Sequence, residues 1–93
     1  YDPDLLPQPI RDVVQKMKKL PTTYTNQPIK TKRAIIQGLI RSIELANEIV
    51  SKIRTLQKSL EASKTPRRIG FDIKTQAVNL YVLTKEIRRF NFD

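Results

Sequence analysis

The 93-residue chain contains neither cysteine nor histidine. Their absence excludes disulfide bonds, zinc sites built from Cys and His, thiol nucleophiles and imidazole acid–base catalysis. A lack of cysteine is typical of intracellular proteins, so we expect a cytoplasmic or nuclear location. No apolar run is long enough to span a bilayer and no signal-peptide pattern is present, so we do not expect a membrane as partner.

Glycine and acidic residues are also scarce, with two glycines and nine Asp or Glu residues. Two distant glycines exclude a glycine-rich phosphate loop. Glu44 and Glu48 lie four residues apart on one helical face, a spacing at which carboxylates usually pair with neighbouring cations such as Arg41 or Lys52. We therefore expect no enzymatic activity, no cofactor, no metal and no small-molecule substrate.

Basic residues are abundant instead. Eighteen Lys and Arg give a formal net charge of +9 and a pI of about 10.2. The excess of basic over acidic residues is larger than solubility alone requires. The simplest alternative is that the charges only keep the protein soluble. A small basic protein favours a polyanionic partner, which is nucleic acid first and an acidic protein or an anionic membrane second.

The longest patterned stretch covers residues 29–60. Its apolar residues follow a seven-residue repeat in two interleaved series at spacings of three and four, which predicts one face of a long amphipathic helix. Four further residues widen that face, so we expect partners on more than one side. The first series is Ile29, Ile36, Ile43 and Val50, the second is Leu39, Ala46, Ile53 and Leu60, and the widening residues are Ile35, Ile40, Ile49 and Leu56.

Prolines divide the rest of the chain. They predict helices over residues 9–20, 28–63 and 72–90, after an irregular lead-in over residues 1–8 from which Leu5 and Leu6 dock on the bundle. Residues 63–70 contain Pro66 and Gly70 and predict a basic turn, after which Asp72 is a good N-cap. The predicted fold is a single all-α domain over residues 1–93, a helical bundle built on a long antiparallel hairpin plus a short N-terminal helix.

Two clusters of cations are the candidate nucleic-acid-binding sites. Arginine side chains on a turn can hold phosphate oxygens bidentately, and the antiparallel hairpin brings the start of the long helix near the end of the last one. The predicted turn cluster is Lys64, Arg67 and Arg68, and the predicted second patch is Lys30, Lys32, Arg33, Arg88 and Arg89, with Arg41 and Lys85 near it.

Aromatic residues are few. Tyr24, Phe90 and Phe92 are candidates for stacking on bases, because cations lie near them in the sequence. Phe71 and Tyr81 continue apolar patterns, so we expect them in the core or in an interface.

A short helix ending in Leu20-Pro21, a long amphipathic helix, a basic turn and a helix with Leu80, Leu83 and Arg88-Arg89 form a familiar order of elements. It resembles the small basic four-helix-bundle proteins, which include the accessory variability determinant of diversity-generating retroelements and the ribosomal intervening-sequence bundle proteins. The resemblance implies a homo-oligomeric bundle, a pentameric barrel in the accessory protein, that binds a reverse transcriptase and nucleic acid without catalysis. The family's Gly-Gly-Trp-type ending and fourth helix are missing here, so no site residue is carried over.

Two functions follow as hypotheses. The first is a non-enzymatic module that binds nucleic acid, either RNA or a nucleoprotein complex, through phosphate-backbone electrostatics. The alternative is a protein–protein interaction or assembly module that docks its aliphatic faces on a larger, acidic partner. A protein partner or a homo-oligomer is expected under either hypothesis.

Overall fold

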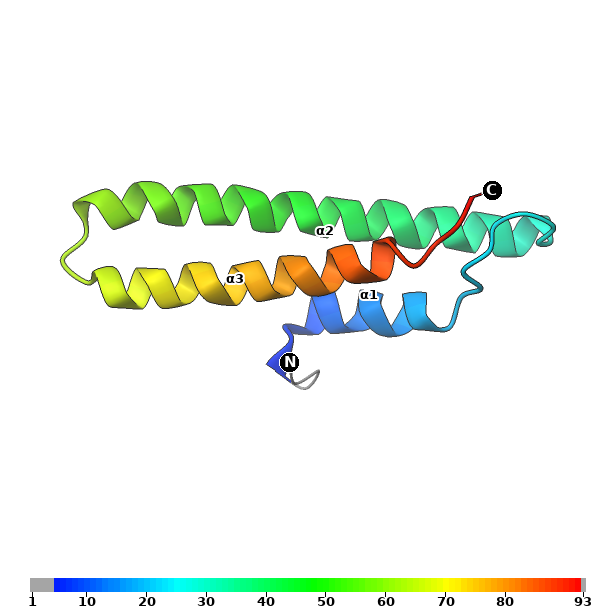
Figure 1. The fold of residues 1–93 in the computed structure, drawn as a ribbon, viewed down its shortest axis with the longest axis horizontal. Helices are drawn as coiled ribbons and strands as arrows, with labels where there is room; N and C mark the ends of the chain where they lie inside the picture. The colour runs from blue at the N-terminus through cyan, green and yellow to red at the C-terminus, as the bar shows by residue number, and fades with distance from the viewer. Residues whose placement is uncertain (1–4, 93) are drawn as a thin grey trace.

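The computed structural model describes residues 5–92 and consists of three helices (Figure 1). They are α1 (Gln8–Lys18), α2 (Ile29–Ala62) and α3 (Pro66–Ile87). Within the described residues there is no β-strand, only an isolated parallel bridge between Thr23 and Asn91. The prediction of an all-helical bundle is confirmed, and the molecule is a slender rod of 55 × 23 × 18 Å.

Helix α2 runs the length of the rod, and α3 returns beside it after a turn of three residues (Figure 1). Because α2 has 34 residues and α3 has 22, the start of α2 extends beyond the end of α3 by about 18 Å, at 1.5 Å per residue. Helix α1 contacts both of the others, in the half of the rod away from the turn. The bundle therefore has three helices over only part of its length.

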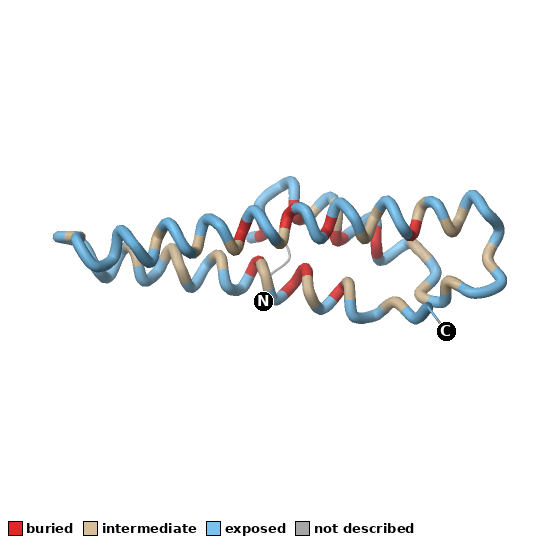
Figure 2. The backbone as a smooth tube through the Cα atoms, turned by 90° about the horizontal axis from the view of Figure 1, so that it is seen from above, coloured by how far each residue is buried: buried red, intermediate tan, exposed pale blue. Residues whose placement is uncertain are grey.

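We call the part that contains α1 the three-helix half, and residues 51–78, which form the rest of α2, the turn and the start of α3, the two-helix arm. Every buried side chain of the described residues lies in the three-helix half, and none between residues 51 and 78 is buried (Figure 2). The core consists of Leu6 with Ile10, Val14 and Met17 of α1, Ile35, Ser42, Leu45 and Ile49 of α2, and Asn79, Val82, Leu83 and Glu86 of α3.

Helix α1 packs closely on α2 because small residues lie between them. The Ser42 Oγ lies 2.8 Å from the Gly38 carbonyl oxygen and 2.6 Å from the Met17 Sδ, so its single hydroxyl proton is shared between these two acceptors. A Cβ at Gly38 would lie 3.4 Å from the Leu20 Cδ1. The spacing of Ile10, Val14 and Met17 gives α1 one apolar face, and α1 buries this face. Leu6 docks on the core, whereas Leu5 is exposed.

The predicted start of the last helix is wrong by six residues. Helix α3 begins at Pro66, and the turn comprises only residues 63–65, where the Ser63 Oγ accepts a hydrogen bond from the Thr65 N–H at 2.9 Å. Proline suits the first helical position because its missing N–H would be unpaired there. Asp72 is therefore inside the helix and does not cap it, and α3 ends at Ile87 instead of residue 90.

The two other helices begin and end within two residues of the predicted bounds. Of the predicted irregular lead-in, residues 1–4 lie outside the described residues, and α1 begins at Gln8.

The predicted contact face of α2 is also partly wrong. The core face is centred on Ile35, Leu45 and Ile49, while the series that begins at Ile29 lies on the opposite side. Ile29 is 67% exposed and Ile43 is 48% exposed. Helix α2 is apolar on two sides, and α1 and α3 cover only one of them.

Candidate nucleic-acid interface

The two-helix arm carries a dense group of exposed positive charges. Its 28 residues hold seven of the 18 Lys and Arg but only two acidic residues, Glu61 and Asp72. Among residues 5–92, ion pairs join Arg41 to Glu44 and Arg89 to Glu86, and both lie in the three-helix half. Within the described residues, none of the arm's cations forms an ion pair; they are Lys52, Arg54, Lys58, Lys64, Arg67, Arg68 and Lys74.

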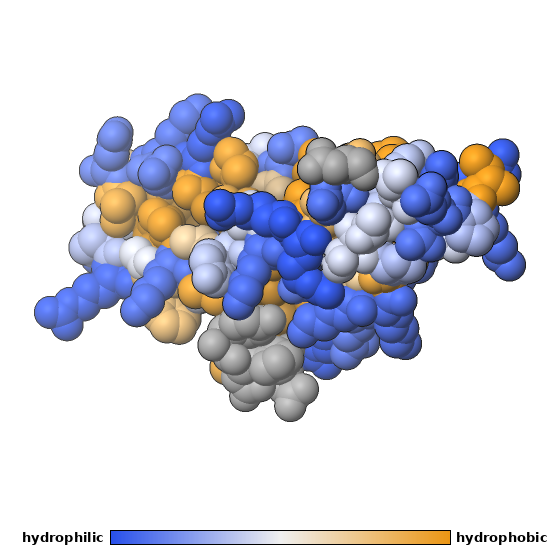
Figure 3. Space-filling model, turned by 45° about the vertical axis from the view of Figure 1, so that its right-hand side comes forward, coloured by the Kyte–Doolittle hydropathy of each residue, from blue (hydrophilic) through white to orange (hydrophobic). Residues whose placement is uncertain are grey.

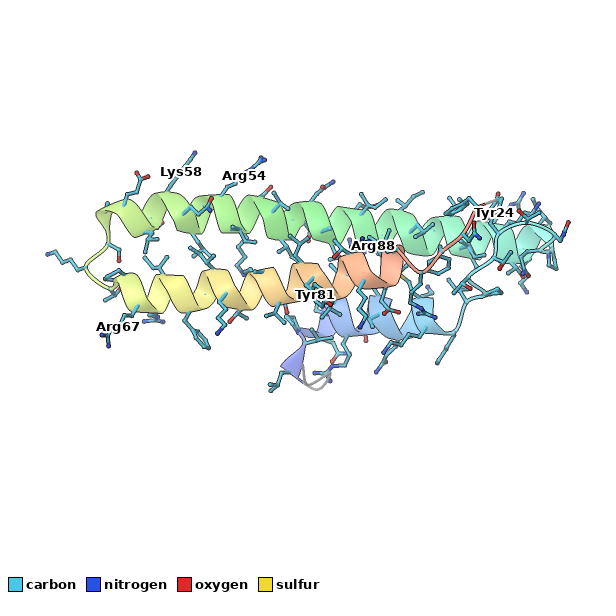
Figure 4. The ribbon with its side chains drawn as sticks, viewed as in Figure 1. Tyr24, Arg54, Lys58, Arg67, Tyr81 and Arg88 are labelled. Atoms are coloured by element: carbon cyan, nitrogen blue, oxygen red, sulfur yellow. The ribbon has the colours of Figure 1, made fainter. Side chains whose placement is uncertain are left out.

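The cations surround the arm instead of covering one face. Arg54 and Lys58 are one turn apart on the side of α2 that points away from α3, and Arg67 points away on the α3 side (Figure 4). Lys64 lies in the turn between the helices. Arg67 and Arg68 belong to the first turn of α3, so they point in different directions about the helix axis. They therefore do not present two adjacent guanidinium groups to one phosphate, as was expected of a turn.

The structure does not join the second predicted cluster into one patch. Lys30 and Arg33 are exposed at the start of α2, whereas Arg88 follows α3, which ends beside the middle of α2. The Arg89 Nη1 lies 2.6 Å from the Glu86 Oε1, and Glu86 is almost fully buried. Arg89 is therefore held by a contact within the fold, and its guanidinium is less available to a ligand than that of Arg88.

Lys32 has a different neighbour. Its Nζ lies 5.2 Å from the centroid of the Tyr24 ring, within the range of a cation–π interaction. The Tyr24 ring lies 5.2 Å from that of Phe92, and the backbone around Asn91 bonds to Thr22 and Tyr24 at 2.7 and 3.0 Å. The residues after α3 are thereby fastened to the loop before α2.

Sequence reasoning missed several exposed residues of this region. Arg54, Lys58 and Lys74 were not among the predicted site residues, although the four-residue spacing of the first two places them together on a helix face. Phe71 and Tyr81 are 68% and 60% exposed, so they are not in the core. The signal that identifies them is their place among cations on α3, since Phe71 lies between Arg67 and Lys74.

No family model matches the chain, and no curated protein or solved structure is significantly similar to it. Across the described part of the chain, no three of the metal-binding side chains His, Cys, Asp and Glu come together. None of the three helices in the described region is long and apolar enough to cross a bilayer.

Proposed function

We propose that this protein is a non-enzymatic module that binds nucleic acid through phosphate contacts made by the two-helix arm. The observation that carries the proposal is the set of seven exposed arm cations, none of which forms an ion pair among the described residues. Such charges attract a polyanion, and each phosphate contact releases condensed counterions into solution. Because the cations surround the arm, we expect it to follow a phosphate backbone without reading the base sequence.

The test is a salt series with labelled RNA and duplex DNA from about 50 to 200 mM salt. We expect log K to fall linearly with log salt. The variant Arg67→Ala with Arg68→Ala should weaken binding and lower the slope by roughly 1.4–1.8, at about 0.7–0.9 per phosphate contact. Lys18→Ala with Lys19→Ala, which removes two exposed charges from the other half, is the matched control.

Two results would contradict the proposal. One is the absence of binding at the lowest salt concentration. The other is an equal loss of affinity and slope in the two double variants, because binding would then depend on total charge and not on the arm. Circular dichroism checks that both variants keep their helices.

A second candidate function is docking on an acidic protein partner. Four isoleucines of the outer face of α2 are exposed, and a cleft of about 360 Å³ opens beside them, lined by Tyr24, Ile29 and Ile36 together with Lys32, Arg33 and Gln37. Figure 3 shows apolar side chains reaching the surface between charged ones. The exposed isoleucines are Ile29, Ile36, Ile40 and Ile43.

Cations next to this face, including Lys32 and Arg33, favour an acidic amphipathic helix as the occupant, because a second copy of the chain would bring like charges together. A designed helical peptide with leucine on one face and glutamate beside it should bind, and the same peptide with lysine should not. Ile36→Ala with Ile40→Ala should weaken this binding at least tenfold, while Arg67→Ala with Arg68→Ala should not. Equal binding of both peptides, or a dimer in light scattering that the isoleucine variant abolishes, would contradict this assignment.

A further inference from the structure

Seven residues form one continuous line along the outer face of α3, which we call the outer α3 stripe. Successive members are separated by four and three residues in turn, which keeps them on one side of a helix. All seven are exposed, and Figure 4 labels the first, the fifth and the last along the helix. The stripe consists of Arg67, Phe71, Lys74, Val78, Tyr81, Lys85 and Arg88.

The stripe lies to one side of the core residues of α3, roughly a third of a turn around the helix from them at about 100° per residue. The buried residues of α3 are Asn79, Val82, Leu83 and Glu86, which face α1 and α2. The exposed fractions of Phe71 and Tyr81, 68% and 60%, show that the described chain leaves most of both rings uncovered. Exposed aromatic rings that alternate with cations are the arrangement found in grooves that bind single-stranded nucleic acid.

The outer face of α2 provides an internal comparison. It also presents large apolar side chains to solvent, but they are aliphatic, as at Ile36, Ile40 and Ile43. Isoleucine can pack against a protein but has no flat face for a base, whereas phenylalanine and tyrosine stack on any base. The two exposed apolar faces therefore suit different ligands.

We propose that the outer α3 stripe binds single-stranded nucleic acid, with bases stacked on Phe71 and Tyr81 and phosphates contacted by the cations between and beyond them. The inference rests on the proposed function and names the form of nucleic acid that it requires. A duplex keeps its bases stacked on one another, so only a single strand offers free base faces to the two rings. Ten residues separate the rings, or about 15 Å along the helix axis, and the whole stripe spans about 32 Å.

The experiment compares three ligands of equal charge. They are a 12-nucleotide single strand, the same backbone without bases, and a duplex whose length is chosen to match the number of phosphates. At about 3.4 Å per stacked nucleotide, the 12-nucleotide strand is about 40 Å long and covers the stripe. We expect the intact single strand to bind most tightly, because only this ligand supplies both phosphates and free bases.

Variants then separate stacking from charge. Phe71→Ala and Tyr81→Ala should each weaken binding of the intact single strand roughly tenfold, leave the base-free strand and the duplex unchanged, and keep the salt slope, because neither removes a charge. Phe71→Tyr should keep the affinity, since a ring is still present. Leu5→Ala, which removes a large exposed side chain elsewhere, is the matched control.

The possible failures of the two proposals can be distinguished. If single strand and duplex bind equally and Phe71→Ala changes neither, while Arg67→Ala with Arg68→Ala still weakens both, the arm binds nucleic acid but the stripe does not stack on bases. If Phe71→Ala weakens the base-free strand as much as the intact one, stacking is likewise excluded. A change in molecular mass by light scattering without loss of single-strand affinity would assign the rings to a protein contact. If no ligand binds, both proposals are wrong.

Discussion

The two parts of this molecule are built from the same two helices but have different interiors. In the three-helix half, α1 covers the groove between α2 and α3, and side chains such as Ile35 and Leu83 are fully buried. The two-helix arm also contains large aliphatic residues, yet Ile53, Leu56 and Ile73 are only partly buried. The comparison shows that two helices alone bury these side chains only partly. A third helix is needed to exclude solvent and form a core.

The charges follow the same division. In the three-helix half, carboxylates form ion pairs with some of the cations, as Glu86 does with Arg89 and Glu44 with Arg41. In the arm none of the seven cations has such a partner among the described residues. The half with the core thus holds the buried contacts of the described residues, and the cations of the arm stay exposed to solvent.

The largest expected effect comes from truncating equivalent leucines in the two parts. Leu83→Ala should lower the free energy of unfolding by about 2–5 kcal/mol, because Leu83 is fully buried and its loss leaves a cavity. Leu60→Ala, in the arm, should cost less than about 1 kcal/mol, because Leu60 is already 37% exposed. Urea unfolding followed by circular dichroism measures both. Similar losses in the two variants would mean that the arm has a core of its own.

An intermediate effect is expected from two arginines. Arg89→Ala should cost about 1–2 kcal/mol, because it leaves the carboxylate of Glu86 almost buried without its charged hydrogen bond. Arg67→Ala should be neutral or slightly stabilising, because it removes a cation from the positive end of a helix. Both variants remove one positive charge, so a thermal melt of each separates the local contact from the overall charge. If Arg67→Ala were the more destabilising variant, the division of roles between the two parts would be wrong.

The smallest effect is expected at the two glycines, both inside helices. Gly70→Ala in the arm should raise the free energy of unfolding by up to about 1 kcal/mol, since alanine favours the helix and no atom beyond the adjoining helix backbone lies within 4 Å of the new Cβ. Gly38→Ala should gain less, because its Cβ would lie 3.4 Å from the Leu20 Cδ1 and α1 would have to adjust. Differential scanning calorimetry can rank the two. A larger gain at Gly38 would show that α1 is not closely packed there.

Local signals in the sequence were sufficient for part of the fold. Pro21 correctly marks the end of the first helical segment, and the spacing of Ile10, Val14 and Met17 identifies the face that α1 buries. The start of α3 was missed because Pro66 is equally compatible with a turn and with the first position of a helix.

The contact face of α2 could not be predicted from periodicity alone. Two of its sides are apolar, and only the positions of α1 and α3 decide that Ile35 is buried while Ile36 is exposed. The candidate site has the same limit. The basic turn in the sequence predicts Lys64, Arg67 and Arg68 as site residues, but the exposure of Phe71 depends on where α1 ends along the rod.

The three-residue turn between α2 and α3 also bears on the order of folding. Contacts next to this turn join residues close in sequence, whereas those between α1 and α3 join residues about 70 positions apart, such as Val14 and Val82. Closing the longer loop costs more chain entropy, so local pairing near the turn can form early. We therefore expect the two-helix arm, although it has no buried core, to be among the first parts to form. Helix α1 would then dock on α2 and α3 in a later step.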